Sequence, residues 1–147
     1  EMAGLVVAEH VKEDFPSILN FSIRDEFVSS KQWLDNYRKG TFCSIDDILD
    51  GASEPAIATP ENSNQSQSDT LGLLTFFQVK SKLTVPIFQK NKLWGLLVVH
   101  QCQTTREWKE EEISFLKSLA FYVGMILHQV DASQNLEQLH HELVDQE

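Results

Sequence analysis

The sequence predicts a single α+β domain, in which a mostly antiparallel sheet is flanked by helices and a long helix follows. Two segments, 81–88 and 92–99, have apolar strand patterns, and the short polar stretch between them predicts a hairpin. Apolar residues then recur every three or four positions from Ile113 to Val130, which predicts a helix with one face on the sheet. A length of 147 residues fits one domain with a core of its own.

The charge balance excludes several classes of partner. Twelve Lys and Arg against 22 Asp and Glu give a net charge of −10 without a basic patch, so we expect no nucleic-acid partner and no direct membrane contact. No apolar run reaches the roughly 18 residues of a membrane helix, and the first residues are not a signal peptide. Two cysteines make neither a disulfide framework nor a metal-binding pattern, so we expect a cytoplasmic protein without a metal.

The first third of the chain alternates between predicted strands and a helix. The β-branched segment 4–11 predicts a buried strand. Trp33 and Tyr37 stand at helical spacing, and Gly40 is placed to end that helix. The alternation of apolar and polar residues over 42–45 predicts a second short strand.

Residues 50–69 interrupt the apolar pattern. The segment is rich in Ser, Asn, Gln, Pro and Ala and has almost nothing to bury. We expect a mobile surface loop, since loops of this length inside compact domains are usually functional or disordered.

The end of the predicted long helix has a different pattern from its beginning. After residue 130 the apolar positions step by four, three and four along a mostly polar helix. Such a narrow seam needs a partner, so we expect a coiled-coil-like signalling helix over 131–147 that forms a homodimer. Its apolar residues are Ala132, Leu136, Leu139 and Leu143.

The segment "SKLTVPIFQKNKLWGLLVVHQCQTTREWKEEEISFLKSLAFYVGMILHQ" strongly resembles the GAF domains of cyanobacteriochromes, the cyanobacterial relatives of phytochromes. The upstream stretches "GLVVAEHV" and "YRKGTFCSIDDI" are similar to further motifs of that family. The resemblance implies a GAF-type sandwich over 1–130 that binds a linear tetrapyrrole, a bilin, and passes its signal through a helix to an output domain, most often a histidine kinase. It also implies a helix and a strand ahead of the "GLVVAE" motif, which here stands almost at the first residue, so the sheet would lack a central member.

The sequence departs from the family at the residues that attach the bilin. The family's Cys-His pair stands just before "FQV", and those positions fall on Asp69 and Thr70 here. The second cysteine of one subgroup falls on Phe27. A carboxylate does not replace a thiolate as the nucleophile, so we expect no covalent bilin.

Five residues remain candidates for a ligand pocket, and each also has an ordinary structural interpretation. By the resemblance, Asp25 hydrogen-bonds pyrrole N–H groups, Tyr37 meets a propionate and His100 lines the pocket; Phe77 stands at the "FQV" motif. Cys43 is a substitute attachment residue by hypothesis, and a half-buried strand cysteine otherwise. His100 and Cys102 share a strand face but lack an orienting carboxylate, so we expect no enzyme.

Two interpretations of function therefore compete. In the favoured one, the domain has lost its chromophore and serves as a dimerising or small-ligand-sensing relay. In the alternative, it is a photoreceptor that binds a bilin non-covalently or through Cys43. A pocket lined by Asp25, Tyr37, Phe77 and His100 and large enough for a tetrapyrrole favours the photoreceptor, whereas a space filled by Phe and Trp favours the relay.

Overall fold

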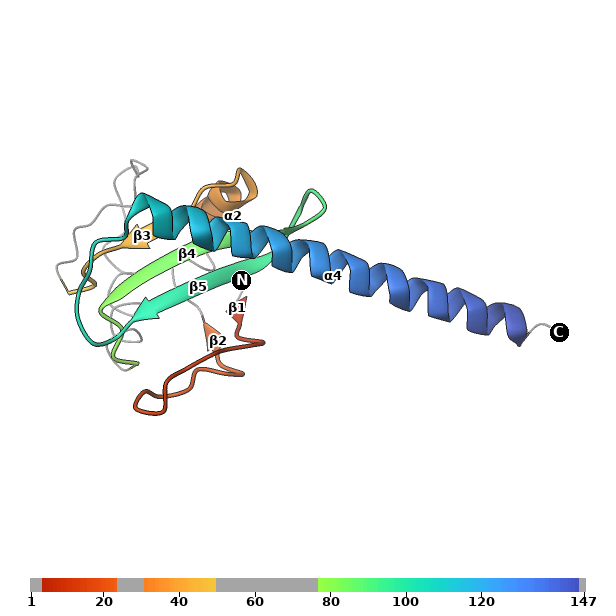
Figure 1. Ribbon diagram of the computed structural model, residues 1–147, viewed down its shortest axis with the longest axis horizontal. Helices are drawn as coiled ribbons and strands as arrows, with labels where there is room; N and C mark the ends of the chain where they lie inside the picture. The colour runs from red at the N-terminus through yellow and green to blue at the C-terminus, as the bar shows by residue number, and fades with distance from the viewer. Residues whose placement is uncertain (1–3, 24–30, 50–76, 146–147) are drawn as a thin grey trace.

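The computed structural model describes residues 4–23, 31–49 and 77–145. Two helices and five strands occur in these residues, and Figure 1 shows their arrangement. They are β1 (Gly4–Leu5), β2 (Ser22–Ile23), α2 (Lys31–Arg38), β3 (Cys43–Ile45), β4 (Ser81–Gln89), β5 (Lys92–Gln101) and α4 (Glu110–Val144). The predicted loop over 50–69 lies outside the described residues.

The main sheet has three strands in the order β3-β4-β5, and both pairings are antiparallel. The predicted hairpin is confirmed, with a tighter turn than the polar stretch suggested: β4 ends at Gln89 and β5 begins at Lys92. Lys90 takes a left-handed backbone conformation, φ 56°, which such a tight turn requires. Among the described strands β4 is the central one, and β5, which carries His100, pairs with β4 alone among them.

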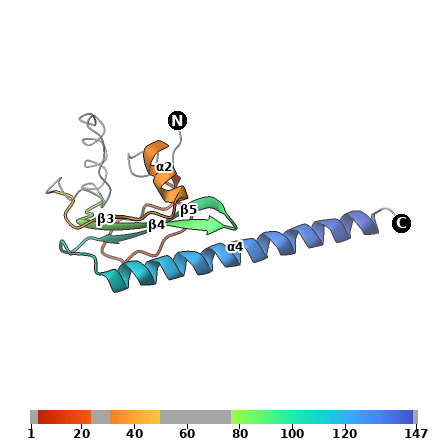
Figure 2. The same ribbon diagram turned by 90° about the horizontal axis from the view of Figure 1, so that it is seen from above.

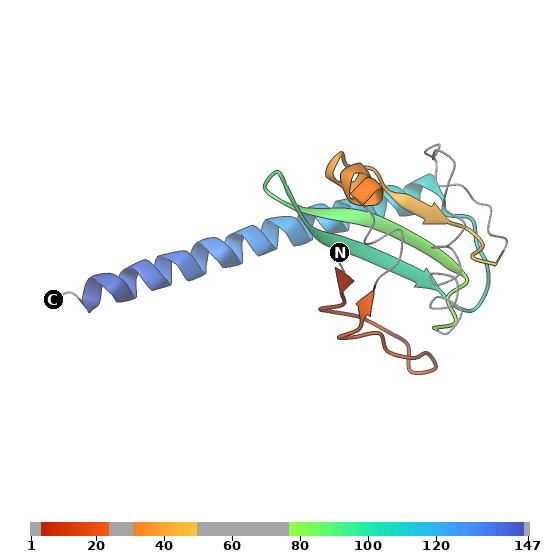
Figure 3. The same cartoon turned by 180° about the vertical axis from the view of Figure 1, so that it is seen from behind.

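The first predicted strand is much shorter than its apolar pattern suggested. β1 pairs only with β2, over two residues, and beyond it Val7 is 64% exposed. Two further backbone bonds continue the pairing: the Val6 N–H donates to the Phe21 carbonyl at 3.0 Å, and the Asn20 N–H donates to the Val6 carbonyl at 2.9 Å. Figures 1 and 3 show this pair beyond β5, on the side away from β3. The segment 4–11 is therefore not a buried strand, because no described strand covers its second half.

The two helices lie on opposite faces of the main sheet, as Figure 2 shows. Alternate residues of β4 divide between these faces. Leu83, Val85 and Ile87 point to α4 and form one core cluster with Leu116 and Ala120. The second cluster lies between the sheet and α2. The α+β sandwich predicted from the sequence is thus observed.

The helix predicted around Trp33 and Tyr37 is α2. Both aromatic side chains are buried against the sheet, at 2% and 0% exposure. Gly40 follows the helix with φ 86°, a conformation that side chains disfavour, so it ends α2 as expected.

The long helix α4 begins with three glutamates, which favour the positive end of the helix dipole. Its first half packs on β4 and β5, through Ile113, Val123 and Leu127 at the margin of the core. Val130 is 47% exposed, so the expectation that it belongs to the sheet-facing side is wrong. Beyond it the helix leaves the body of the domain as a stalk (Figure 1).

Among the described helices, α4 contains a long apolar segment. By length and composition alone, this helix is long and apolar enough to cross a bilayer, and only 17% of the relevant window is buried. One face of the same window, however, packs on the sheet through Leu116, Ala120 and Gly124. The fold therefore buries one side of this segment, and the other residues of the window are exposed or partly exposed.

Candidate functional site

Three of the five predicted pocket residues come together on the α2 face of the sheet. Tyr37 and Cys43 have no exposed surface and Phe77 is 7% exposed; all three belong to one core cluster with Trp33. The rings of Trp33 and Tyr37 are 5.6 Å apart between centroids. Asp25, like positions 27, 69 and 70, lies outside the described residues.

The strand register places His100 on the same face. Lys82 of β4 stands directly between Ile45 and His100 on the neighbouring strands. In the adjacent row, Thr84 stands between Cys43 and Val98. Lys82, Thr84 and His100 therefore lie on the α2 face of β4 and β5, the face that also carries the aromatic cluster under α2.

Electrostatics on this face favour uncharged side chains. Burial, together with the nearby positive charge of Lys82, lowers the pKa of His100 to about 4, so its imidazole is neutral at pH 7. Burial also raises the pKa of the Cys102 thiol, which makes the reactive thiolate scarcer. An imidazole with such a low pKa is a weak base, and a thiol with a raised pKa forms little thiolate. His100 and Cys102 are therefore a poor nucleophilic pair, which agrees with a lining or structural role for both.

The segment between β5 and α4 ties this region to the start of the long helix. The buried Ser81 hydroxyl donates to the Asp46 carbonyl at 2.6 Å and accepts from the Arg106 backbone N–H at 2.9 Å. Trp108 donates through its indole N–H to the Ile45 carbonyl at 3.3 Å. Arg106 in turn pairs with Glu112 in the first turn of α4. Strand β3, strand β4 and helix α4 are thereby joined at one point.

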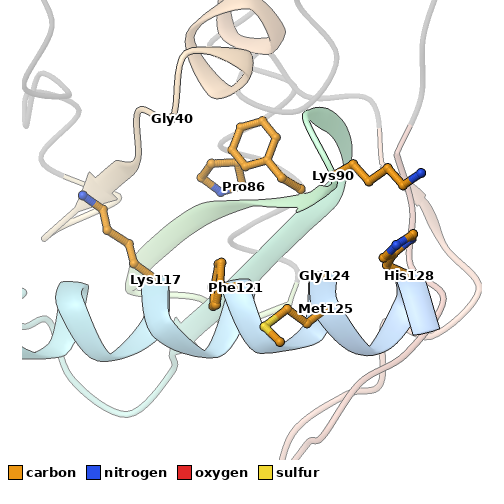
Figure 4. A pocket seen from close by; sticks show the side chains of 9 residues that line it. Gly40, Pro86, Lys90, Lys117, Phe121, Gly124, Met125 and His128 are labelled. Atoms are coloured by element: carbon orange, nitrogen blue, oxygen red, sulfur yellow. The ribbon is translucent and has the colours of Figure 1, made fainter. Parts of the chain in front are cut away.

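A groove of about 400 Å³ lies elsewhere, between α4 and the end of the β4–β5 hairpin (Figure 4). None of the predicted pocket residues lines it. Its basic side chains come from the hairpin turn and from one flank of α4, and Lys117 among them lies over the Phe42 ring at 4.6 Å. Sequence patterns gave no signal for this groove, because its walls meet only when the helix docks on the hairpin. It is lined by Gly40, Pro86, Phe88, Lys90, Lys117, Phe121, Gly124, Met125 and His128.

The four residues expected to dimerise lie on the stalk. Leu136, Leu139 and Leu143 are 56–68% exposed, and Ala132 is exposed as well. No described part of the chain covers them.

The architecture is thus an antiparallel sheet between a short helix and a long helix that leaves the domain. The chain belongs to the GAF domain family, whose model matches residues 25–127. A protein of Synechocystis sp. named as a methyl-accepting chemotaxis protein is 32% identical over 88% of this chain. The circadian input-output histidine kinase CikA of the same organism is 33% identical over 63% of this chain. The chain spans only 12% and 11% of these two relatives.

Solved structures place the fold among light-sensing GAF domains. The blue-light absorbing form of the Thermosynechococcus elongatus PixJ GAF domain superposes with a TM-score of 0.73 at 29% identity, and covers 95% of this chain and 75% of that one. A phycocyanobilin-bound GAF domain from a cyanobacterial phytochrome superposes with a TM-score of 0.67 at 27% identity, over 86% of this chain and 68% of that one. The GAF fold and the likeness to cyanobacteriochromes that the motifs implied are thus confirmed.

Proposed function

We propose that this chain is a signal-relay GAF domain of a cyanobacterial multi-domain signalling protein of the histidine kinase class. In this proposal residues 1–130 form the sensory domain and 131–147 form a coiled-coil-like signalling helix. The domain carries no covalent bilin, catalyses no reaction itself, and acts by dimerising or by sensing a small ligand. The chemotaxis and kinase names of its relatives, together with the small share of those proteins that it spans, support a module within a larger cytoplasmic protein.

The packing of the predicted pocket residues carries this proposal. Tyr37 and Cys43 are completely buried, and with Trp33 and Phe77 they belong to one aromatic cluster of the core. Space filled by aromatic side chains is what a relay without chromophore requires. Buried aromatic side chains stabilise a core by themselves, and this role needs no ligand.

The available thiols also fit covalent attachment poorly. The family's attachment pair corresponds to Asp69 and Thr70 in this sequence, and neither is a nucleophile for a vinyl or ethylidene carbon. Cys43 has no exposed surface, and burial raises the pKa of Cys102. A bilin held by this chain would therefore depend on non-covalent contacts.

The partners in this proposal are a second copy of the chain and an output domain of the same polypeptide. The second copy pairs through Ala132, Leu136, Leu139 and Leu143, which are exposed on the stalk. Their spacing is that of a coiled-coil seam. No nucleic acid and no direct membrane contact belong to this proposal.

One observation favours the alternative, a photoreceptor domain that binds a bilin non-covalently or through Cys43. His100 lies on the same sheet face as Tyr37 and Cys43, as a pocket-lining histidine must, and the related phytochrome domain is a phycocyanobilin-bound structure. In this case Asp25 would hydrogen-bond the pyrrole N–H groups, His100 would line the pocket and Tyr37 would meet a propionate. The bilin would supply light absorption and isomerisation.

Co-expression with bilin biosynthesis enzymes separates the two functions. The relay predicts a colourless protein after purification. A coloured protein that keeps its pigment in acid urea and fluoresces with zinc would overturn the relay and require covalent attachment. Colour that is lost in acid urea would establish non-covalent binding.

The variants Cys43→Ala and Cys102→Ala serve as matched controls in this experiment. If pigment remains attached in acid urea, only the variant that lacks the attachment cysteine will lose it. A bilin-binding GAF domain from a related cyanobacteriochrome, expressed in the same cells, confirms that pigment was supplied.

A further inference from the structure

The groove between α4 and the end of the β4–β5 hairpin is apolar along its length and basic at both ends. Its apolar surface comes from β4 and from Phe121 and Met125 of α4. Figure 4 shows Lys90 and His128 at one end of the groove and Lys117 at the other. None of the described residues that line it is acidic.

Two large apolar side chains are left uncovered at this groove. Phe121 is 64% exposed and Met125 is 46% exposed, although Gly124, between them on α4, is buried. The groove measures about 400 Å³, which lies within the range of about 300–1,000 Å³ that is typical of small-molecule sites. A ligand with an apolar body would cover both side chains.

The charge around the groove is opposite to that of the whole chain. The chain has a net charge of −10, yet no Asp or Glu occurs in residues 80–106, which include β4 and β5. None occurs in residues 113–130 either, the part of α4 that lies beside these strands. The basic side chains of the groove therefore attract an anionic ligand that the acidic remainder of the chain repels.

Lys90 and His128 form the polar end that an anionic group needs. Lys90 follows β4 with φ 56°, a conformation for which tight turns favour glycine. Among the described residues, neither the Lys90 ammonium nor the His128 imidazole has a hydrogen bond or an ion pair. Lys117, at the other end, is already engaged, since its ammonium lies 4.6 Å from the centroid of the Phe42 ring.

We infer that this groove binds a small amphipathic anion, a molecule with a carboxylate or phosphate group on an apolar body. The anionic group lies between Lys90 and His128, and the apolar body lies along Phe121 and Met125. The inference rests on the proposed function, in which the domain senses a small ligand, and it names the site and the chemical class of that ligand. Because Lys90 belongs to the hairpin and His128 to α4, the ligand joins these two elements just before the stalk.

Decanoate and decyl phosphate, with 1-decanol as their neutral counterpart, are the probes that test this site. From Lys117 to His128 the groove extends about 16 Å along α4 at about 1.5 Å per residue, enough for a decyl chain. Amide NMR spectra of the full chain locate the binding, and we expect both anions to shift the signals of Lys90, Gly124 and His128. Decanol lacks the charge, so it should bind at least about ten-fold more weakly.

Matched substitutions separate the groove from the rest of the surface. Lys90→Gln removes the charged partner of the anion and Phe121→Ser removes an apolar wall, and each should weaken decanoate binding at least about ten-fold. Lys92→Gln removes the same charge from the hairpin outside the groove. Phe115→Ser removes a ring of α4 that is 65% exposed and also lies outside it. Both controls should leave the affinity nearly unchanged, and circular dichroism confirms that each variant is folded.

The outcomes separate this inference from the proposed function. If the anions shift the amides of Tyr37, Cys43 and His100 instead, a ligand-sensing relay stands and the groove is wrong. If neither anion binds, the inference is overturned and the relay rests on dimerisation alone. Equal binding of decanol and decanoate, or equal effects of Lys90→Gln and Lys92→Gln, would show that the groove is not an anion site. If the protein carries a bilin and still binds the anions in the groove, the relay is wrong and this inference stands.

Discussion

Gly124 of α4 lies directly against the backbone carbonyl of Phe88 at the end of β4, and a side chain at this position would collide with that oxygen. The contact sets the distance between the long helix and the hairpin at the place where the stalk leaves the domain. One residue after Phe88, Gln89 donates to the Leu127 carbonyl and to the Asp131 carboxylate, and Asp131 lies two turns beyond Gly124. The hairpin end thus holds the helix just before the stalk.

Replacement of this glycine is expected to loosen the helix. Gly124→Ala should lower the free energy of unfolding by about 2 kcal/mol, because the methyl group pushes α4 from β4. Urea denaturation measures the loss. Gly95→Ala is the matched control, since nothing lies within 4 Å of a Cβ placed there. An equal effect of both substitutions would show that the close approach is not what requires glycine.

The hydroxyl of Ser81 joins β4 to the Asp46 carbonyl and the Arg106 N–H. Ser81→Ala removes a buried hydrogen-bonding group, and we expect a loss of about 1–3 kcal/mol of stability. Ser133→Ala, on the exposed stalk, provides the control and should change little. Thermal unfolding of the two variants side by side makes the comparison; no difference between them would contradict the bridging role.

The buried imidazole of His100 makes the domain sensitive to acid. Its pKa is about 4 in the folded protein, below the ordinary value of 6.5, so the unfolded chain takes up the proton first. The neutral imidazole therefore stabilises the folded protein fully above pH 6.5, and this stabilisation is lost as the pH falls toward 4. The loss is at most about 3 kcal/mol of unfolding free energy. His100→Gln should flatten the decline in urea midpoint between pH 6.5 and 4. If the urea midpoint of the His100→Gln variant declines as steeply as that of the unsubstituted protein, the His100 imidazole is exposed to solvent in the folded state.

Glu112 stabilises the start of α4 in its ionised form. Its carboxylate accepts from the Lys109 backbone N–H at 3.0 Å and pairs with Arg106, and these interactions hold its pKa below the ordinary 4.5. The stabilisation is present above pH 4.5 and disappears as the pH falls through the lower folded pKa. Glu112→Gln should therefore melt below the unsubstituted protein at pH 7, with the gap closing in acid. Glu111→Gln, in the same turn, controls for the loss of charge alone.

Local patterns in the sequence were sufficient for the elements that make most of their own contacts. The alternation of Leu83, Val85 and Ile87 places these residues on one face of a strand, because the side-chain period of a strand is fixed, and in the structure this face packs on α4. Gly40 predicted the end of α2 because of its conformational freedom. The motifs around "LWGLLVVHQC" are sufficient to identify the GAF family, which the family model confirms.

Features that depend on distant segments could not be predicted from local sequence patterns. The segment 4–11 looks like a buried strand, yet its extent depends on a neighbouring strand, and Val7 remains exposed. The apolar pattern of α4 likewise includes Val130, yet this side chain is 47% exposed and lies outside the cluster that packs on the sheet.

The sequence by itself determined the family, the hairpin and the long helix, since these follow from residue type and spacing. Only the tertiary structure decided that Tyr37, Cys43 and Phe77 pack as one cluster, and that His100 faces Lys82 across the strands. It also decided that Gly124 meets Phe88. The reason is physical: periodicity states which side of an element is apolar, but only packing determines which distant side chains fill the space against it.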